Sequence, residues 1–396
     1  MTADAATRVA ASGGDLAALR LDLINQGVRL GDDLLAAGFA LALASEAGSG
    51  QADGIDLILS DGWWTNVCVT PGYARTSPYT LRSAGDQRLV LHHRTRGEVP
   101  VTLPDTARFR HQRTHSGVSC GDIGAVHGPW LVTAPLAARG DLHLDRPRRF
   151  LGLPTVRALQ KSRWSVDEVV ACAEAAWRHA GARLVHLEAG HVLADDGGVA
   201  ELSPYITALK RALPTLVSVA VLPPADPLAT LDLYAAGCDA ISYHLLTWDE
   251  TEAGRVAPVR QRFVPHQRIL AALRAAAAVF PRGAVSTDLL LGLEPLAQTS
   301  TAIDRLTADG VVPNLTVFRP LPGANDEVPH GDLVATEPML ALMSERARLM
   351  QARGLWGSRV RGFPRTLAGN VSYHPTLFDR LYANARRLLR VQLETA

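Results

Sequence analysis

Residues 165–190, SVDEVVACAEAAWRHAGARLVHLEAG, contain one complete helix-to-strand unit. Ser165 and Glu168 have the spacing of a capping box, which predicts that a helix begins directly after Ser165. Gly181 marks the end of that helix, because glycine readily adopts the conformation that ends one. The apolar run that starts at Leu184 has the composition of a buried strand. This stretch therefore predicts an α/β fold.

The same unit recurs as far as Gly323. Strands separated by single helices imply right-handed crossovers, which produce a parallel sheet. About six such units are expected, and an open, partial (β/α)6 TIM-like barrel accommodates them better than an eight-fold barrel. A doubly wound sheet is the competing architecture. The expected helices lie at 203–214, 226–237, 264–280 and 298–310, and the expected strands at 183–190, 215–224, 238–246, 283–294 and 311–320.

Polar residues on the expected strands favour the barrel. Three pairs each share one face of their strand by two-residue alternation: His186 with Glu188, Ser242 with His244, and Ser286 with Asp288. A flat sheet covered by helices on both sides would be apolar on both faces. Polar residues that recur on one face near the strand ends instead predict a lumen that holds a ligand.

The parts of the chain outside the barrel have other patterns. Residues 1–115 combine one or two short helices with strand-like runs, which predicts a small α+β accessory domain with antiparallel pairing. From residues 123–136 onward the pattern becomes strand, loop, helix, and the barrel is expected to span 116–330. Two amphipathic helices predicted within 331–396 form a C-terminal extension that packs around or caps the barrel. The strand-like runs of the first domain lie at 55–64, 65–72, 87–93 and 99–104.

Composition narrows the functional class. The chain has 40 Lys and Arg residues against 39 Asp and Glu residues, so charge gives no reason to expect a nucleic-acid or membrane partner. No apolar run has the length of a membrane span, and the N-terminus lacks the pattern of a secretory signal. The 4 cysteines are widely scattered, which suits a reducing cytoplasm. We expect a cytoplasmic protein whose partner is a small-molecule substrate, and a homodimer stays open.

Several segments carry a resemblance to a known superfamily. Residues 128–323 resemble, in the order and spacing of their motifs, the barrel of radical S-adenosylmethionine (SAM) enzymes of the biotin-synthase-like type. Residues 89–109, LVLHHRTRGEVPVTLPDTARF, resemble more narrowly the radical SAM proteins of nitrilase-linked gene clusters. The barrel motifs are HLEAG at 186–190, YHLLTWDE at 243–250, STDLLLGLEP at 286–295 and FRPLPG at 318–323.

The resemblance implies where SAM would bind. HLEAG matches the turn after strand 2 whose backbone holds the SAM amino group, which makes Gly190 a candidate ligand contact. YHLLTWDE matches strand 4, which reaches the ribose and the methionyl carboxylate, and it implicates Asp249. The motifs matching strands 5 and 6 lie beside adenine in the family, and they implicate Asp288, Gly292, Glu294, Arg319 and Pro320.

Two departures distinguish this chain from the family pattern. Family enzymes carry three cysteines, spaced C-x3-C-x2-C, on the loop after strand 1, where thiolates ligate a [4Fe–4S] cluster. Here that loop, residues 139–150, reads RGDLHLDRPRRF and has no cysteine. The second departure is Leu246, where strand 4 of the family commonly presents an acidic residue. We therefore expect neither an iron–sulfur cluster nor reductive cleavage of SAM.

Arginines occupy the positions of the later family cysteines. Arg146, Arg148 and Arg149 lie on this loop, and a guanidinium group can hold a carboxylate through two parallel hydrogen bonds. We hypothesise that at least one of them binds a carboxylate of SAM or of another amino-acid-like ligand. The alternative interpretation is a solvated basic loop.

SAM remains an electrophile without the cluster. The expected reactions are polar: methyl transfer, aminocarboxypropyl transfer, or internal displacement at the sulfonium, catalysed by a transferase or lyase of small-molecule biosynthesis. Each of them needs a base or a positioned nucleophile. The candidate catalytic residues are His186, Glu188, His191 and His244, since histidine titrates near neutral pH.

Two other functional interpretations stay open. One is a catalytically inactive homologue that serves as a binding or scaffold partner. The other is a metal-dependent enzyme on the same barrel, in which the ligands come from His143, His186, Glu188 and His191.

Other conspicuous residues have structural interpretations. The paired tryptophans Trp63 and Trp64 are typical of a core or an interface. Glu294 either faces adenine or caps the next helix. Acidic and basic residues after strand 4 predict a surface ion-pair network: Asp249, Glu250, Arg255 and Arg260.

Overall fold

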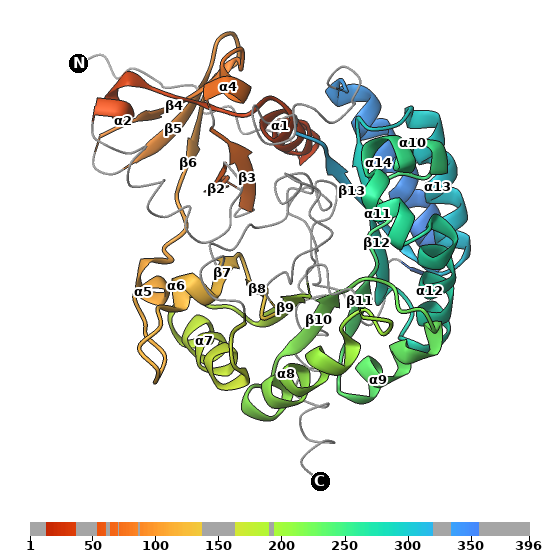
Figure 1. Cartoon of the computed structure of the whole chain (residues 1–396). Helices are drawn as coiled ribbons and strands as arrows, with labels where there is room; N and C mark the ends of the chain where they lie inside the picture. Colours follow the sequence, from red (N-terminus) through yellow and green to blue (C-terminus); the bar gives the residue numbers. More distant parts are fainter. Residues whose placement is uncertain are drawn as a thin grey trace, which may run out of the picture.

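A seven-stranded sheet curled into a half-barrel is the central feature of the computed structural model. The structure describes residues 13–36, 54–60, 64–69, 71–85, 88–136, 163–189, 194–319 and 334–355. The strand order is β13-β12-β11-β10-β9-β8-β7, so neighbours in sequence are also neighbours in the sheet. Helices cover the convex face of this sheet (Figure 1). The predicted α/β class is therefore confirmed.

The strands from β8 to β13 run parallel to one another. They are β8 (Trp130–Thr133), β9 (Leu184–Glu188), β10 (Leu216–Ala220), β11 (Ala240–Ser242), β12 (Val285–Leu291) and β13 (Val312–Val317). The remaining strand, β7 (Gly124–His127), pairs antiparallel with β8. Gly128 turns this hairpin at φ +58°, a conformation that costs glycine little. Residues 123–136 thus contain two strands before the first crossover.

Helices fill the crossovers between the parallel strands. They are α7 (Val166–His179), α8 (Val199–Ala212), η3 (Pro227–Ala229) with α9 (Thr230–Ala235), α10 (Glu250–Val256), α11 (Pro258–Phe263), α12 (His266–Val279) and α13 (Leu296–Ala308). A further helix, α14 (Thr336–Ala352), follows β13 and packs against α13. The predicted capping box is confirmed, since Ser165 accepts a hydrogen bond from the Glu168 backbone and Glu168 accepts one from Ser165 N. None of the described helices is both long and apolar enough to cross a membrane.

The N-terminal elements form two small sheets. One has the order β1-β4-β5-β6, and the other pairs β2 with β3. Every pairing except β1 with β4 is antiparallel, in line with the α+β prediction. Strand β4 was not among the predicted strand-like runs. The strands are β1 (Arg29–Leu30), β2 (Gly54–Ile58), β3 (Trp64–Cys68), β4 (Tyr79–Ser83), β5 (Leu89–His93) and β6 (Gly97–Val101), and the helices are α1 (Gly13–Gln26), α2 (Asp32–Ala36), α4 (Pro71–Ala74), α5 (Ala107–Arg110) and α6 (Cys120–Ile123).

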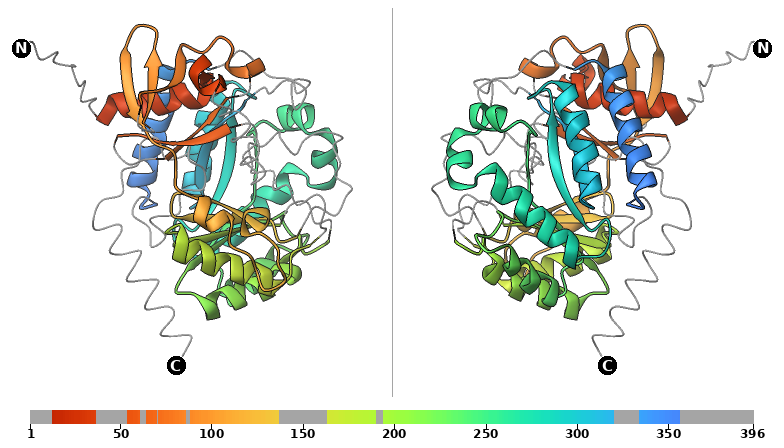
Figure 2. Two further views of the ribbon diagram at one scale, coloured as in Figure 1. Left: turned by 90° about the vertical axis from the view of Figure 1, so that its left-hand side faces the viewer. Right: turned by 90° about the vertical axis from the view of Figure 1, so that its right-hand side faces the viewer.

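Helix α1 connects the N-terminal elements to the barrel. It packs against α14 (Figure 2). Leu21 and Ile24 of α1 belong to the same apolar core as the strands and helices of the half-barrel. The expected domain limits at residues 115 and 330 stay predictions.

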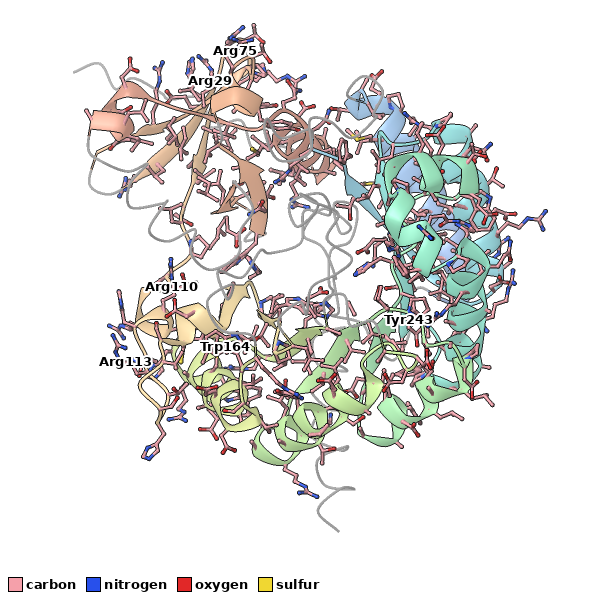
Figure 3. All side chains as sticks on the ribbon, viewed as in Figure 1. Arg29, Arg75, Arg110, Arg113, Trp164 and Tyr243 are labelled. Carbon is pink, nitrogen blue, oxygen red and sulfur yellow. The ribbon has the colours of Figure 1, made fainter. Side chains whose placement is uncertain are left out.

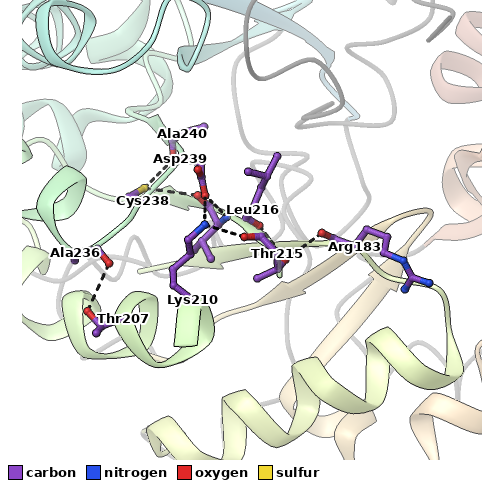
Figure 4. A network of polar contacts seen from close by, with 10 residues as sticks. Arg183, Thr207, Lys210, Thr215, Leu216, Ala236, Cys238, Asp239 and Ala240 are labelled. Atoms are coloured by element: carbon purple, nitrogen blue, oxygen red, sulfur yellow. Dashed lines mark hydrogen bonds and ion pairs between the residues drawn. The ribbon is translucent and has the colours of Figure 1, made fainter. Parts of the chain in front are cut away.

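A buried polar network closes the N-terminal end of the half-barrel (Figure 4). Lys210 of α8 donates to Asp239 Oδ2 at 3.1 Å and to the Thr215 carbonyl at 2.8 Å. The same Asp239 oxygen accepts from Val217 N at 2.9 Å. The Lys210 and Asp239 side chains are only 3% and 0% exposed. This ion pair fixes α8 to the starts of β10 and β11, at the end of the strands opposite the predicted site.

Candidate active site

The concave face of the sheet, called the lumen face below, changes from apolar to polar along the strands. Trp130, Leu184 and Leu216 form an apolar cluster at the starts of β8, β9 and β10. Further along, the lumen face is polar, and the C-terminal ends of parallel strands are where α/β folds place their sites. The polar residues are His186 and Glu188 on β9, Ser218 on β10, Ser242 and His244 on and after β11, Ser286 and Asp288 on β12, and Asn314 on β13.

Tyr243 shows which way His244 faces. The Tyr243 hydroxyl lies 2.7 Å from Thr230 Oγ1, at the start of α9, so this side chain points into the helix layer. Tyr243 is labelled in Figure 3. Successive residues of an extended chain point to opposite sides, and His244 therefore faces the lumen. The predicted sharing of one face is observed for His186, Glu188, His244 and Asp288.

His186 is fully engaged by its neighbours. Its Nδ1 lies 2.6 Å from Ser218 Oγ and its Nε2 lies 2.7 Å from Glu188 Oε1. Burial raises the pKa of Glu188. The contacts with His186 and, to a smaller extent, with His244 lower it by more, so the pKa lies below its usual value. Glu188 is therefore an ionised group inside the lumen at neutral pH.

His244 has the opposite arrangement, with one nitrogen held and one available. Its Nδ1 lies 2.9 Å from Asp288 Oδ2, and Asp288 Oδ1 accepts from Asn314 Nδ2 at 3.0 Å. Its Nε2 is buried and has no hydrogen-bond partner among the described residues. Burial lowers the pKa of His244, but Asp288 and Glu188 raise it above its usual value. An imidazole oriented by a carboxylate, with its second nitrogen available, is the arrangement of a general base.

The backbone beside His244 is irregular. Ser242 pairs with Ser286, whereas Leu246 pairs with Leu289, so the segment after β11 contains one extra residue relative to β12. Leu246 has a φ of +78°, and it is the one non-glycine residue with a positive φ in the described part of the chain. Bulges and such conformations are common next to functional sites, where they redirect a side chain. Here the bulge directs His244 towards Asp288.

Arg260 of α11 lies against this bulge. It is 5% exposed and donates to the His244 carbonyl through one terminal nitrogen. Burial lowers the pKa of Arg260 to about 10, so the group stays charged at neutral pH. Within the described residues it forms no ion pair, so the predicted surface network is wrong for Arg260, while Arg255 does pair with Glu252. A buried cation of this kind is suited to bind a ligand carboxylate.

Three of the predicted ligand contacts already have partners within the protein. Glu294 accepts from the backbone of Trp248 and Asp249 and from Thr299 Oγ1, at 2.7, 3.0 and 3.1 Å. Asp249 caps α10 by accepting from the backbone N–H groups of Thr251 and Glu252. Arg319 donates to the Asn66 side chain and to two backbone carbonyls of the N-terminal elements. Burial raises the pKa of Glu294, although its hydrogen bonds oppose the shift.

The remaining predicted residues are placed as follows. Gly292 ends β12 at φ +101°, a conformation that side-chain-bearing residues rarely adopt. Six positions lie outside the described residues: Arg146, Arg148, Arg149, Gly190, His191 and Pro320. Their roles stay predictions. His143, named as a metal ligand, also lies outside the described residues.

No family model matches the chain, and no curated protein sequence does either. Similar solved structures include coproporphyrinogen III oxidase (HemN) from Escherichia coli, a radical SAM enzyme, at 17% identity and TM-score 0.33 over 44% of this chain and 41% of that one. Methylornithine synthase (PylB) matches at 18% identity and TM-score 0.38, over 46% and 54% of the two chains. The FeFe-hydrogenase maturase HydG from Carboxydothermus hydrogenoformans matches at 17% identity and TM-score 0.43, over 57% and 51%. The matched region thus spans about half of these proteins or less.

Three site residues were missed from the sequence. Ser218, Asn314 and Arg260 hold or neighbour the two histidines. Ser218 and Asn314 follow the same two-residue alternation as the predicted residues, so this signal was present in the sequence. Among the described residues, no three His, Cys, Asp or Glu side chains gather so as to hold a metal ion.

Proposed function

We propose that this chain is a cluster-free enzyme of radical-SAM-like architecture that binds SAM, or a closely related amino-acid ligand, and catalyses a polar reaction with His244 as general base. The observation that carries the proposal is the pairing of His244 with Asp288, which leaves a buried Nε2 with no partner among the described residues. The choice of SAM as the ligand rests on the sequence resemblance to radical SAM barrels. The partial (β/α)6 arrangement of the barrel is part of the same proposal.

The cysteines support the absence of a cluster. Thiolates are the usual ligands of a [4Fe–4S] cluster. All four cysteines of the chain are buried: Cys68 on β3, Cys120 on α6, Cys172 on α7 and Cys238 before β11. None of them lies on the loop after β8, where the family binds its cluster. The residues present therefore do not fit a cluster at that position.

The lumen suits the charges of SAM. A sulfonium is a cation, and Glu188 and Asp288 supply two carboxylates beside the histidines. The carboxylate of an amino acid requires a cation, which Arg260 offers, with Arg146, Arg148 and Arg149 as further proposed contacts. Burial of Asp288 and Arg260 strengthens the interactions that each of them makes.

His244 acts on the nucleophile. SAM supplies an electrophilic carbon bound to a sulfonium. An N–H or O–H group of the acceptor forms a bond to that carbon, the carbon–sulfur bond breaks, and its electron pair stays on sulfur. His244 Nε2 takes the proton that the acceptor loses, and Asp288 stabilises the imidazolium that results. Attack on the methyl group makes the chain a transferase, whereas internal displacement makes it a lyase.

Product analysis tests this proposal. Purified protein is incubated with SAM and candidate amine or hydroxyl acceptors, and products are followed by mass spectrometry, with iron and zinc assayed in the same sample. We expect S-adenosylhomocysteine for methyl transfer or methylthioadenosine for attack on the aminocarboxypropyl carbon. Formation of 5′-deoxyadenosine together with bound iron would contradict the proposal.

Calorimetric titration of SAM tests the proposed carboxylate contact. Arg260→Gln is expected to weaken SAM binding by about tenfold or more, because it removes a charge-assisted hydrogen bond from a buried site. Arg255→Gln is the matched control, since Arg255 is more exposed and pairs with Glu252. Equal affinities of the two variants for SAM would show that Arg260 does not contact the ligand. Single alanine variants of Arg146, Arg148 and Arg149 test the loop in the same titration.

A scaffold role is the second candidate function. It is favoured by one observation, namely that Glu294, Asp249 and Arg319, which the resemblance places at the ligand, bind other parts of the protein. The two functions differ in the titration, because a scaffold has no need to bind SAM.

A further inference from the structure

The half-barrel has two open edges. Within the described residues, β7 and β13 are the outer strands of the seven-stranded sheet, and each has a strand neighbour on one side only. Figure 1 shows α1, β2 and β3 between these two edges. The position of the N-terminal elements therefore raises the question of what holds them to both edges.

A chain of polar contacts crosses the opening through the hairpin formed by β2 and β3. At the β7 edge, His127 Nδ1 lies 2.7 Å from Asp56 Oδ2 of β2. Across the hairpin, Asn66 of β3 donates Nδ2 to Asp56 Oδ1 at 2.9 Å. At the β13 edge, Arg319 donates to Asn66 Oδ1 at 3.0 Å and to the Asn66 carbonyl at 2.7 Å. The Asn66 amide thus joins a carboxylate on one side to a guanidinium on the other.

The contact at the β7 edge is protected from water. The side chains of His127 and Asp56 are 12% and 3% exposed. Hydrogen bonds to a carboxylate in such surroundings are stronger than those at a surface, and loss of one partner leaves the buried Asp56 carboxylate with a hydrogen bond missing. The chain of contacts is therefore expected to hold its geometry firmly.

Further contacts support each end of the hairpin. At the β7 edge, a methyl group placed on Gly128 would lie 3.8 Å from Trp64 Cγ, so Trp64 packs over the β7–β8 turn. At the β13 edge, Arg319 donates to the Ile24 carbonyl at 3.2 Å, and Asn25 donates to the Val334 carbonyl at 2.9 Å. The prediction that the paired tryptophans serve in a core or an interface is consistent with this contact of Trp64, while Trp63 lies outside the described residues.

We infer that α1 and the β2–β3 hairpin form the closing wall of the half-barrel, and that Asp56, Asn66 and Arg319 are positioning residues that couple its two edges. Arg319 follows β13 at the C-terminal end of the strands, two residues after Val317, so this wall fixes the segment that leaves the lumen next to Asn314. The segment that the resemblance assigns to the ligand is in this way held by a residue 253 positions earlier in the chain.

Hydrogen exchange followed by mass spectrometry tests the inference on the full chain without added SAM, so the result does not depend on the proposed reaction. Arg319→Ala removes the contact at the β13 edge. We expect peptides that contain β7, at the far edge, to exchange about tenfold faster, because coupled contacts typically share such energies. Peptides from β9 and β10, which lie between the edges, are expected to keep the wild-type rate.

A conservative variant acts from the other end. Asp56→Asn keeps an oxygen for Asn66 and removes the carboxylate from His127. It is expected to speed exchange in β7 and, to a smaller extent, in β13. Arg353→Ala is the control, since Arg353 binds Asp304 of α13 and lies outside the β2–β3 hairpin. Should Arg319→Ala fail to fold, Arg319→Lys replaces it, and exchange in β7 is then expected to speed up by a smaller factor.

The inference is overturned if Arg319→Ala speeds exchange in β13 alone and leaves β7 at the wild-type rate. It is equally overturned if Arg353→Ala changes β7 as much as Arg319→Ala does, since the effect would then not travel through the hairpin.

Discussion

Replacement of His244 by asparagine is expected to slow SAM consumption by about two to four orders of magnitude, the usual contribution of a general base. Asparagine still offers an N–H group to Asp288 Oδ2, at about the position of the imidazole Nδ1, but it has no basic nitrogen at the position of Nε2. SAM affinity is expected to change less than about threefold, because the proposed carboxylate contact is Arg260. Single-turnover rates and calorimetric affinities provide the two measurements.

His186→Asn is the matched variant for this experiment. Both nitrogens of His186 already have partners, Ser218 and Glu188, so it is poorly placed to take a proton from a substrate. Its replacement is expected to reduce the rate by a much smaller factor than His244→Asn. Equal losses in the two variants would show that the histidines act only through the shape of the lumen.

The pH profile gives an independent check on His244. A general base must be neutral to accept a proton, so kcat/KM is expected to rise with pH and to level off above the pKa of His244, which Asp288 and Glu188 raise above the usual histidine value. The raised pKa of His244 also makes the stability of the fold depend on pH, but stability falls as pH rises, whereas kcat/KM increases. A pKa that is higher in the folded state stabilises the protein below the unfolded pKa, and this stabilisation is lost as pH rises through the folded pKa.

The sequence predicted the lumen because its signal is local. Alternation over two residues is enough to place His186 with Glu188 and Ser286 with Asp288 on one face, and strand neighbours then bring the pairs together. The bulge before Leu246 lacks such a signal, since a one-residue offset between two strands depends on both of them.

Long-range contacts explain the other differences. Arg260 lies among charged residues at helical spacing, which resembles a surface ion-pair pattern, and only the packing of α11 against the end of β11 buries it. Arg319 matched a ligand motif, yet its guanidinium binds Asn66, 253 positions away. Patterns along the chain report periodicity and composition, and they carry no information on which distant side chains meet.

The largest effect on stability is expected at the opposite end of the half-barrel, where Lys210 pairs with Asp239. Lys210→Met leaves the Asp239 carboxylate buried with its partner cation removed, and the loss of one partner from such a pair costs about 3 to 5 kcal/mol. Asp239→Asn leaves the ammonium group in the same position without its carboxylate. Each single variant is therefore expected to lower the free energy of unfolding in urea by about this amount.

The double variant Lys210→Met with Asp239→Asn separates burial of a lone charge from loss of the pair. Asparagine keeps an oxygen that can accept from Val217 N, and methionine fills much of the space of the lysine stem. Neither variant residue carries a charge, so the double variant is expected to be more stable than either single variant. If the effects of the two single variants on the free energy of unfolding were instead additive, Lys210 and Asp239 would not interact, and the attachment of α8 to the starts of β10 and β11 would have to come from other contacts, such as the hydrogen bond from Lys210 to the Thr215 carbonyl.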